Sequence, residues 1–81
     1  MVSHDKIETC LKQDKSVQHV HVSGDGYHYE LLVVSDEFKG MRPVKRQQWV
    51  YAKLNQYITS GDLHALTMKS FTKAEWESSR E

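Results

Sequence analysis

The stretch SVQHVHVSGDGYHYELLVVS, residues 16–35, decides the fold of this chain. Apolar and polar residues alternate through 16–22, where the last two valines would face one side and the two histidines the other, and this predicts a half-buried strand. The SGDG run at 23–26 favours a tight turn. Residues 27–35 resume as a strand whose second half is continuously apolar, which is typical of a central or doubly covered position. We therefore predict an antiparallel hairpin.

Helical patterns flank this hairpin, and a third strand follows it. Ser3 can cap a first helix, and Pro43 suits the first turn of a long helix over 43–59. Residues 63–71 alternate again and predict a third strand. The TKAE run at 72–75 is a capping box that begins a short last helix. The predicted order of elements is therefore α-β-β-α-β-α.

This order defines an α+β fold, which we expect to form one domain over residues 1–81. The second and third strands are joined by a helix, so if they are neighbours they pair in parallel with a right-handed crossover. We expect a three-stranded mixed sheet covered on one face by helices.

The composition excludes several classes of protein. Cys10 is the single cysteine, so neither an internal disulfide nor a cysteine-only metal site can form, and a reducing, cytoplasmic location fits. No apolar run is long enough to span a membrane, and the first residues do not resemble a signal peptide. There is no nucleophile elbow, zinc-protease motif, P-loop or dinucleotide-binding glycine pattern, so we expect no enzyme and no small-molecule substrate.

The charges are segregated although their sum is zero. No acid occurs between Phe38 and Gly61. We expect one side of the long helix to be buried, namely Val44, Gln47, Tyr51, Leu54 and Ile58, flanked by Val50 and Tyr57. The roughly opposite side carries Arg42, Lys45, Arg46, Trp49 and Lys53. A solvated surface is the simplest interpretation of such cations, but a tryptophan among them indicates a surface for nucleic acid or a protein partner.

Two histidines stand where parallel strands would begin. His28 precedes the second strand and His64 the third, and strands lie about 4.8 Å apart, so the two imidazoles could bind one metal ion. Two histidines are incomplete for a structural zinc site, so the remaining ligands would come from another molecule. The competing interpretation is that both are ordinary, partly exposed histidines. His19 and His21 have a spacing that can chelate zinc or copper, although a solvated strand face explains them as well.

Three segments resemble the BolA-like family, in the family's order and over most of the chain. They are VHVSGDGYHYELLVVSDEFKG (20–40), VKRQQWVYAKL (44–54) and LHALTMKSFTKAEW (63–76). The pattern from Gly61 to Trp76 is fairly specific for the family. The SGDG turn followed by His28, together with Gln47, resembles its IbaG-type branch. The resemblance implies a type II KH-like fold that lacks the G-x-x-G loop by which KH modules grip nucleic acid.

The resemblance implies an adaptor that partners a monothiol glutaredoxin and shares a [2Fe–2S] cluster with it. In that arrangement the glutaredoxin cysteine and a glutathione thiolate come from the partner side. His64 matches the C-terminal histidine ligand of the family, and His28 matches a second ligand from the loop between the first two strands. No cluster would be tightly bound to this chain alone. An imidazole must be neutral to ligate, so we expect cluster affinity to fall in acid.

The family is also linked to DNA binding and transcriptional control through a basic surface. In this chain that surface maps onto Arg42, Lys45, Arg46 and Lys53, with Lys69 on the third strand as a possible addition. Two positions depart from the family pattern, because Arg42-Pro43 replaces a common Ser-Arg pair and Lys73 replaces a frequent proline. The alternative function is a small DNA-binding regulator whose histidines sense acid, and a third is an RNA-binding KH-like module.

Overall fold

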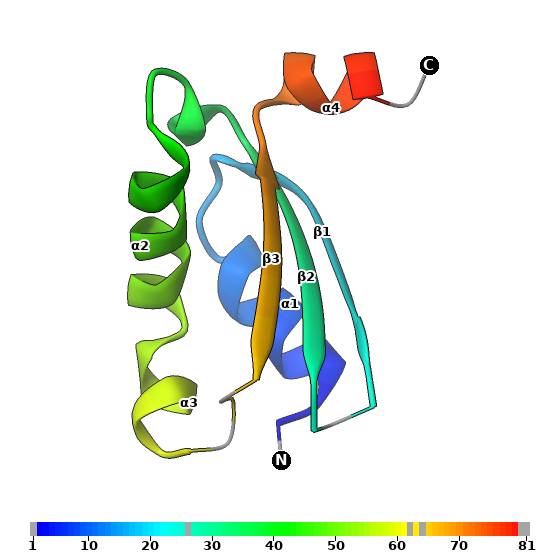
Figure 1. The fold of residues 1–81 in the computed structure, drawn as a ribbon, viewed down its shortest axis with the longest axis vertical. Coiled ribbons are helices and arrows are strands. Elements are labelled where there is room, and N and C mark those ends of the chain that lie inside the picture. Colours follow the sequence, from blue (N-terminus) through cyan, green and yellow to red (C-terminus); the bar gives the residue numbers. More distant parts are fainter. Residues whose placement is uncertain (1, 26, 62, 64, 80–81) are drawn as a thin grey trace.

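Three strands form one mixed sheet in the order β1–β2–β3 (Figure 1). The computed structural model describes residues 2–25, 27–61, 63 and 65–79. The strands are β1 (Val17–Gly24), β2 (Tyr29–Ser35) and β3 (Leu66–Phe71). β1 and β2 are antiparallel, and β2 and β3 are parallel, so the predicted hairpin and the predicted parallel pair are confirmed. β2 is therefore the central strand, and β3 lies at an edge.

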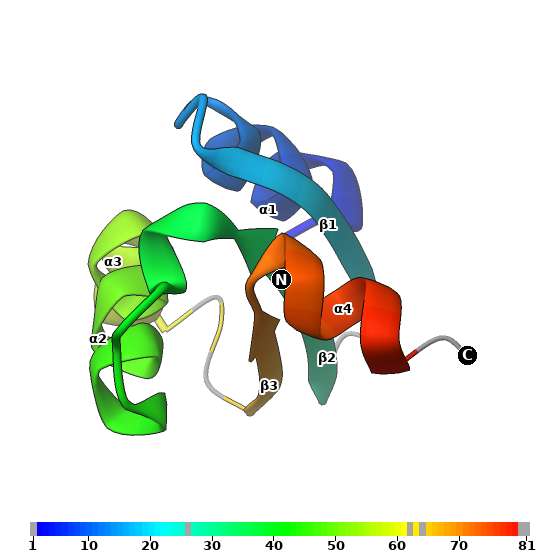
Figure 2. The same ribbon diagram turned by 90° about the horizontal axis from the view of Figure 1, so that it is seen from above.

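Helices cover one face of this sheet, as predicted. The covering elements are α1 (His4–Lys12), the 3-10 turn η1 (Asp36–Phe38), α2 (Pro43–Lys53) and α3 (Asn55–Thr59). The last helix, α4 (Lys73–Ser79), contacts the other face through Trp76, which stacks on His19. Seen from above, α1, α2 and α3 lie on the same side of the sheet, while α4 lies at the end where β3 finishes (Figure 2). No helix in the described part of the chain is long and apolar enough to cross a membrane.

The hydrophobic core lies between the sheet and the covering helices. Strand alternation sends every second residue inward, and the helices meet them with a few aliphatic side chains. The fully buried members include Ile7, Leu11, Val33, Phe38, Val50 and Leu54. Burial of each such side chain contributes about 1.5–3 kcal/mol, so this layer is the main source of stability.

The buried side of α2 differs from the predicted one. Val50 and Leu54 are fully buried, but Val44 is 62% exposed and Tyr51 is 38% exposed. The prediction was therefore wrong for Val44 and Tyr51, and for Gln47, which is also exposed. The helix is rotated so that Arg46 and Trp49 are half-buried instead, because both have long apolar surfaces and find partners elsewhere in the fold.

The predicted helix over 43–59 is divided at Leu54. This residue has φ −101° and ψ 10°, outside the helical range, so α2 ends and α3 begins in a new direction. The chain then leaves α3 through Gly61, whose φ is +85°, a conformation that favours glycine. The backbone N–H of Leu63 donates to the carbonyl of Tyr57 (3.1 Å), which fixes the approach to β3.

Candidate functional site

The turn between β1 and β2 holds His28 on a defined backbone. Gly24 has φ +123°, and a Cβ at this position would overlap the backbone oxygen of His28, so only glycine fits. The carboxylate of Asp25 accepts hydrogen bonds from the backbone N–H of His28 (2.9 Å) and of Tyr27 (3.0 Å). These two donors, His28 first, lower the pKa of Asp25, so the turn keeps an ionised carboxylate at neutral pH.

The imidazole of His28 is exposed and makes one polar contact with a neighbouring strand. Its Nε2 lies 3.1 Å from the Oγ1 of Thr67 on β3. If Nε2 carries the proton, it donates to the hydroxyl, and Nδ1 keeps a lone pair that can bind a metal. A hydroxyl in this position can therefore set the tautomer and the orientation of the ring.

β2 and β3 begin at the same end of the sheet. Tyr29 pairs with Leu66, and the N–H of Tyr29 donates to the carbonyl of Ala65 (2.7 Å). The residues that flank position 64 therefore lie beside the strand that follows His28. His64 itself lies outside the described residues. Within those residues, no three His, Cys, Asp or Glu side chains are grouped as a metal site.

Arg46 has a structural role that the sequence did not reveal. Its guanidinium donates to Glu75 of α4 through two hydrogen bonds, of which the shorter is 2.7 Å. It also donates to the carbonyls of Met41 (3.0 Å) and Ser70 (3.3 Å). The side chain is 13% exposed. Through these contacts Arg46 joins α2, β3 and α4. Its predicted role in binding nucleic acid or a protein partner stays a prediction.

The carboxylate of Glu75 is the partner of this arginine. The hydrogen bond from Arg46, and next the backbone N–H of Thr72, lowers the pKa of Glu75 to about 2. The Thr72 hydroxyl in return accepts from the N–H of Glu75 (3.2 Å), so the predicted capping box is confirmed. Asp36 completes this end, because it accepts a hydrogen bond from the backbone N–H of Lys73 (3.2 Å).

Trp49 and Lys53 find their partners within the fold. The ring of Trp49 meets that of Phe38 edge to face, with centroids 5.3 Å apart, and the Nζ of Lys53 lies 5.0 Å from the Trp49 centroid. Lys53 pairs with Asp14 as well (2.8 Å). Lys53, followed by the hydrogen bonds from Ser16, lowers the pKa of Asp14 to about 2. These contacts explain why a tryptophan occurs among cations without requiring a ligand.

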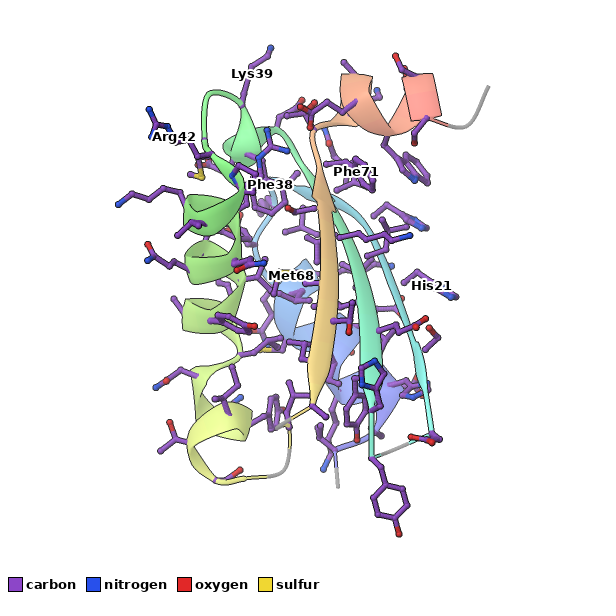
Figure 3. All side chains as sticks on the ribbon, viewed as in Figure 1. His21, Phe38, Lys39, Arg42, Met68 and Phe71 are labelled. Carbon is purple, nitrogen blue, oxygen red and sulfur yellow. The ribbon has the colours of Figure 1, made fainter. Side chains whose placement is uncertain are left out.

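Arg42 and Lys45 are the predicted cations that remain on the surface. Both are exposed, and in the described part of the chain neither takes part in an ion pair. They line a shallow hollow with Met41, Gln48 and Trp49, and Figure 3 shows Arg42 and Lys39 directed outward at the start of α2. Lys69 does not join them, because strand alternation places it on the opposite face of the sheet.

That opposite face carries the remaining histidines of β1. His19 stacks on Trp76 of α4 with centroids 4.6 Å apart and an interplanar angle of 20°. His21 pairs across the strands with Leu32, which in turn pairs with Lys69, and it is directed away from the helices in Figure 3. The stacking gives His19 a packing role, while metal binding by His19 and His21 stays untested.

Thr67 is the residue of this site that the sequence analysis missed. Its contact with His28 depends on the pairing register of two strands that are 39 positions apart in sequence at these residues. No local pattern reports such a register. The alternation of β3 does place Thr67 on the exposed side, and the predicted parallel pairing would have brought it near His28.

The fold and the exposed imidazole define a small α+β protein with a candidate ligand at the edge where parallel strands begin. A family model described as BolA-like protein matches residues 6–75. The acid stress protein IbaG of Escherichia coli is 42% identical over 79 residues, covering 98% of this chain and 94% of that protein. The chain belongs to the BolA-like family, and this relative supports its IbaG branch.

Two further relatives extend this result. A bolA protein homologue from Coxiella burnetii has a solved structure that superposes with a TM-score of 0.81 at 31% identity, covering 95% of this chain and 99% of that one. A DNA-binding transcriptional regulator BolA of Haemophilus influenzae is 37% identical over 65 residues, covering 78% of this chain and 62% of that protein. The predicted family and fold are thus confirmed.

Proposed function

We propose that this protein is a non-enzymatic adaptor that partners a monothiol glutaredoxin and shares a [2Fe–2S] cluster with it. The observation that carries the proposal is the exposed His28 imidazole, which contacts the Thr67 hydroxyl at the end of the sheet where β2 and β3 begin. His64 is the second candidate ligand and comes from the resemblance to the family. The partner would supply thiolates, which remain reduced in the cytoplasm.

The donor chemistry suits such a shared cluster. Imidazole replaces thiolate in some [2Fe–2S] centres and raises their reduction potential. Two imidazoles from one protein and two thiolates from the partner side complete four ligands. Cluster binding by His28 requires a neutral ring, so assembly should weaken in acid.

The test is cluster assembly with separate histidine variants. We would mix the protein with a glutathione-loaded monothiol glutaredoxin, iron and sulfide, and record visible absorption and circular dichroism. His64→Ala and His28→Ala should each alter the cluster spectrum. His21→Ala is the matched control, since this histidine is exposed on β1 and lies outside the candidate site. A spectrum that responds equally to all three variants, or to none, would contradict the proposal.

A second candidate function is DNA binding with transcriptional control. The regulator among the relatives favours it, as do Arg42 and Lys45, which remain exposed at the start of α2. Removing one cation that neutralises a phosphate should reduce the slope of log affinity against log salt by about 0.9. Arg42→Ala and Lys45→Ala should therefore each lower the slope, while Lys6→Ala on α1 should not. Binding that does not depend on salt would eliminate this function.

A further inference from the structure

In the described part of the chain no strand pairs with the outer edge of β3, so this edge is available to another chain. The N–H of Tyr29 donates to the carbonyl of Ala65, so by parallel-strand alternation residues 65, 67 and 69 direct their backbone groups toward β2. The backbone N–H and C=O of Leu66 and Met68 therefore point away from the sheet. Such an edge is a template for an added strand.

Arg46 closes one part of this edge and leaves the other part open. Its guanidinium covers the outward carbonyl of Ser70 at 3.3 Å, near the end of β3. The free length is then the stretch around Leu66 to Met68, close to the start of the strand. An added segment would pair over about three residues, or roughly 10 Å.

An apolar groove runs beside this free stretch. It has a volume of about 560 Å³ and lies between β3 and the exposed side of α2 and α3; its lining includes Tyr51, Ala52, Ile58, Leu63 and Leu66. Tyr51 is 38% exposed, so its ring forms an accessible part of this wall. Side chains of an added strand could pack against this wall while the backbone pairs with β3.

The charges along α2 indicate which end of a bound segment should be apolar and which should be acidic. Gln48 lines both the apolar groove and the hollow that contains Arg42 and Lys45, so the two depressions are neighbours. No acid occurs from residue 38 to 61, and Arg46 and Lys53 are already paired with carboxylates. The occupant should therefore be apolar near Leu66 and acidic toward Lys45.

We propose that the groove between α2 and the free edge of β3 receives an extended apolar-to-acidic segment of the glutaredoxin partner, which adds a short strand to β3. This inference rests on the proposed function. Continuity supports this choice of occupant, because Leu63 and Leu66 line the groove and also flank the segment that contains the second candidate ligand. One molecule can then occupy the groove and complete the metal site.

Binding without a cluster tests the groove alone. We would titrate the protein with a glutaredoxin free of iron and sulfide and measure the dissociation constant by calorimetry. Ala52→Arg places a long side chain in the groove, whereas Ala74→Arg makes the same change on exposed α4. We expect Ala52→Arg to weaken binding about tenfold or more, and Ala74→Arg to change it less than about twofold. Equal effects of the two variants, or no effect of Ala52→Arg, would overturn the proposal that the partner binds in the groove.

Backbone exchange tests the added strand. In the complex the amide protons of Leu66 and Met68 should become protected from hydrogen exchange, while that of Thr67, which already faces β2, should change little. Weaker binding by Ala52→Arg without this protection would overturn strand addition.

The outcomes separate this inference from the proposed function. If the pair assembles a cluster through His28 and His64 but Ala52→Arg binds normally, the groove is wrong and the function stands. If glutaredoxin binds through the groove and no cluster forms, cluster sharing is wrong and the docking stands. If the wild-type proteins do not bind at all, both are wrong.

Discussion

The two ends of the sheet use their polar side chains in opposite ways. We define the latched end by Asp36, Arg46, Thr72 and Glu75, which fasten α4 to the rest of the fold through hydrogen bonds between 2.7 and 3.3 Å. We define the histidine end as the turn from Gly24 to Tyr29 with the start of β3. There Asp25 accepts a hydrogen bond from the backbone N–H of His28, but the His28 ring is exposed and contacts one hydroxyl. Figure 1 shows the latched end at the top and the histidine end at the bottom.

This difference teaches which side chains remain able to bind another molecule. An arginine that already satisfies a carboxylate and two carbonyls would have to break those hydrogen bonds before it could bind a phosphate. An exposed imidazole with one hydrogen bond to a hydroxyl gives up fewer contacts on binding a metal. The predicted ligand at the histidine end is therefore better suited to its role than the predicted DNA contact at the latched end.

The largest effect should follow a change in the turn of the histidine end. Gly24→Ala would force a side chain into the left-handed region against the backbone of His28, so unfolding in urea should show a loss of about 3 kcal/mol. Gly40→Ala is the control, because φ there is also positive (+79°) but nothing lies within 4 Å of the added atom. It should cost about 1 kcal/mol. Equal losses would mean that the turn is less rigid than the geometry indicates.

A smaller loss should follow removal of the arginine at the latched end. Arg46→Ala leaves a half-buried carbonyl and Glu75 without their donor, and we expect about 2 kcal/mol less stability in urea. Lys45→Ala, one position away and fully on the surface, should change stability by less than about 0.5 kcal/mol. If the two variants behave alike, Arg46 is not the fastener of this end.

Acid should loosen the latched end through Glu75. Its pKa falls from an ordinary 4.5 to about 2 in the folded protein, so the ion pair stabilises the fold fully above pH 4.5. That contribution is lost as pH falls from about 4.5 to about 2. The Thr72 amide, which donates to Glu75, should report the change in an NMR titration with an apparent pKa near the lower value.

The same titration in Arg46→Ala gives the control. Without the guanidinium, the pKa of Glu75 should move back toward its ordinary value. An unchanged titration would show that the Thr72 backbone, and not Arg46, governs this carboxylate.

The smallest effect on stability should come from Thr67 at the histidine end. Thr67→Val keeps the shape of an exposed strand residue and should change unfolding by less than about 0.5 kcal/mol. It should nevertheless shift the tautomer balance of His28, visible in the nitrogen chemical shifts of the ring. Thr67→Ser should restore the wild-type shifts. Identical shifts in all three proteins would show that the hydroxyl does not orient the ring.

The strands could be predicted from the sequence because their signals are local. The alternation of residues 16–22, the SGDG turn and the apolar run after Tyr29 each act within a few positions. The helix that joins β2 to β3 then predicted a parallel pair on the condition that the two strands are neighbours, as they are. These elements account for the whole topology, and the structure confirms it.

The buried side of α2 could not be predicted, because it depends on contacts with residues that are distant in sequence. Periodicity alone favoured burial of Val44 and Tyr51, since charged positions were assumed to face water. Arg46 is half-buried because Glu75, 29 positions later, arrives beside it. Lys53 is held against the fold because Asp14 lies across from it. Partners so distant in sequence leave no trace in a local pattern.

The candidate metal site was only partly accessible from the sequence. The position of His28 before β2 follows from the hairpin, and the structure gives it the expected exposure at the edge shared with β3. His64 lies outside the described residues and stays a prediction. Thr67 required the register between the two strands, which the sequence does not specify.

The hydroxyl of Tyr29 donates to the carbonyl of Val2 at 2.6 Å, which fixes the first residues of the chain beside the start of β2. Val2 therefore lies at the same end of the sheet as His28, whereas the last described turn of α4 lies at the far end of the molecule (Figure 1). Purification tags and fluorophores belong after α4, since a polyhistidine tag ahead of Val2 would add competing imidazoles to any test of the proposed cluster.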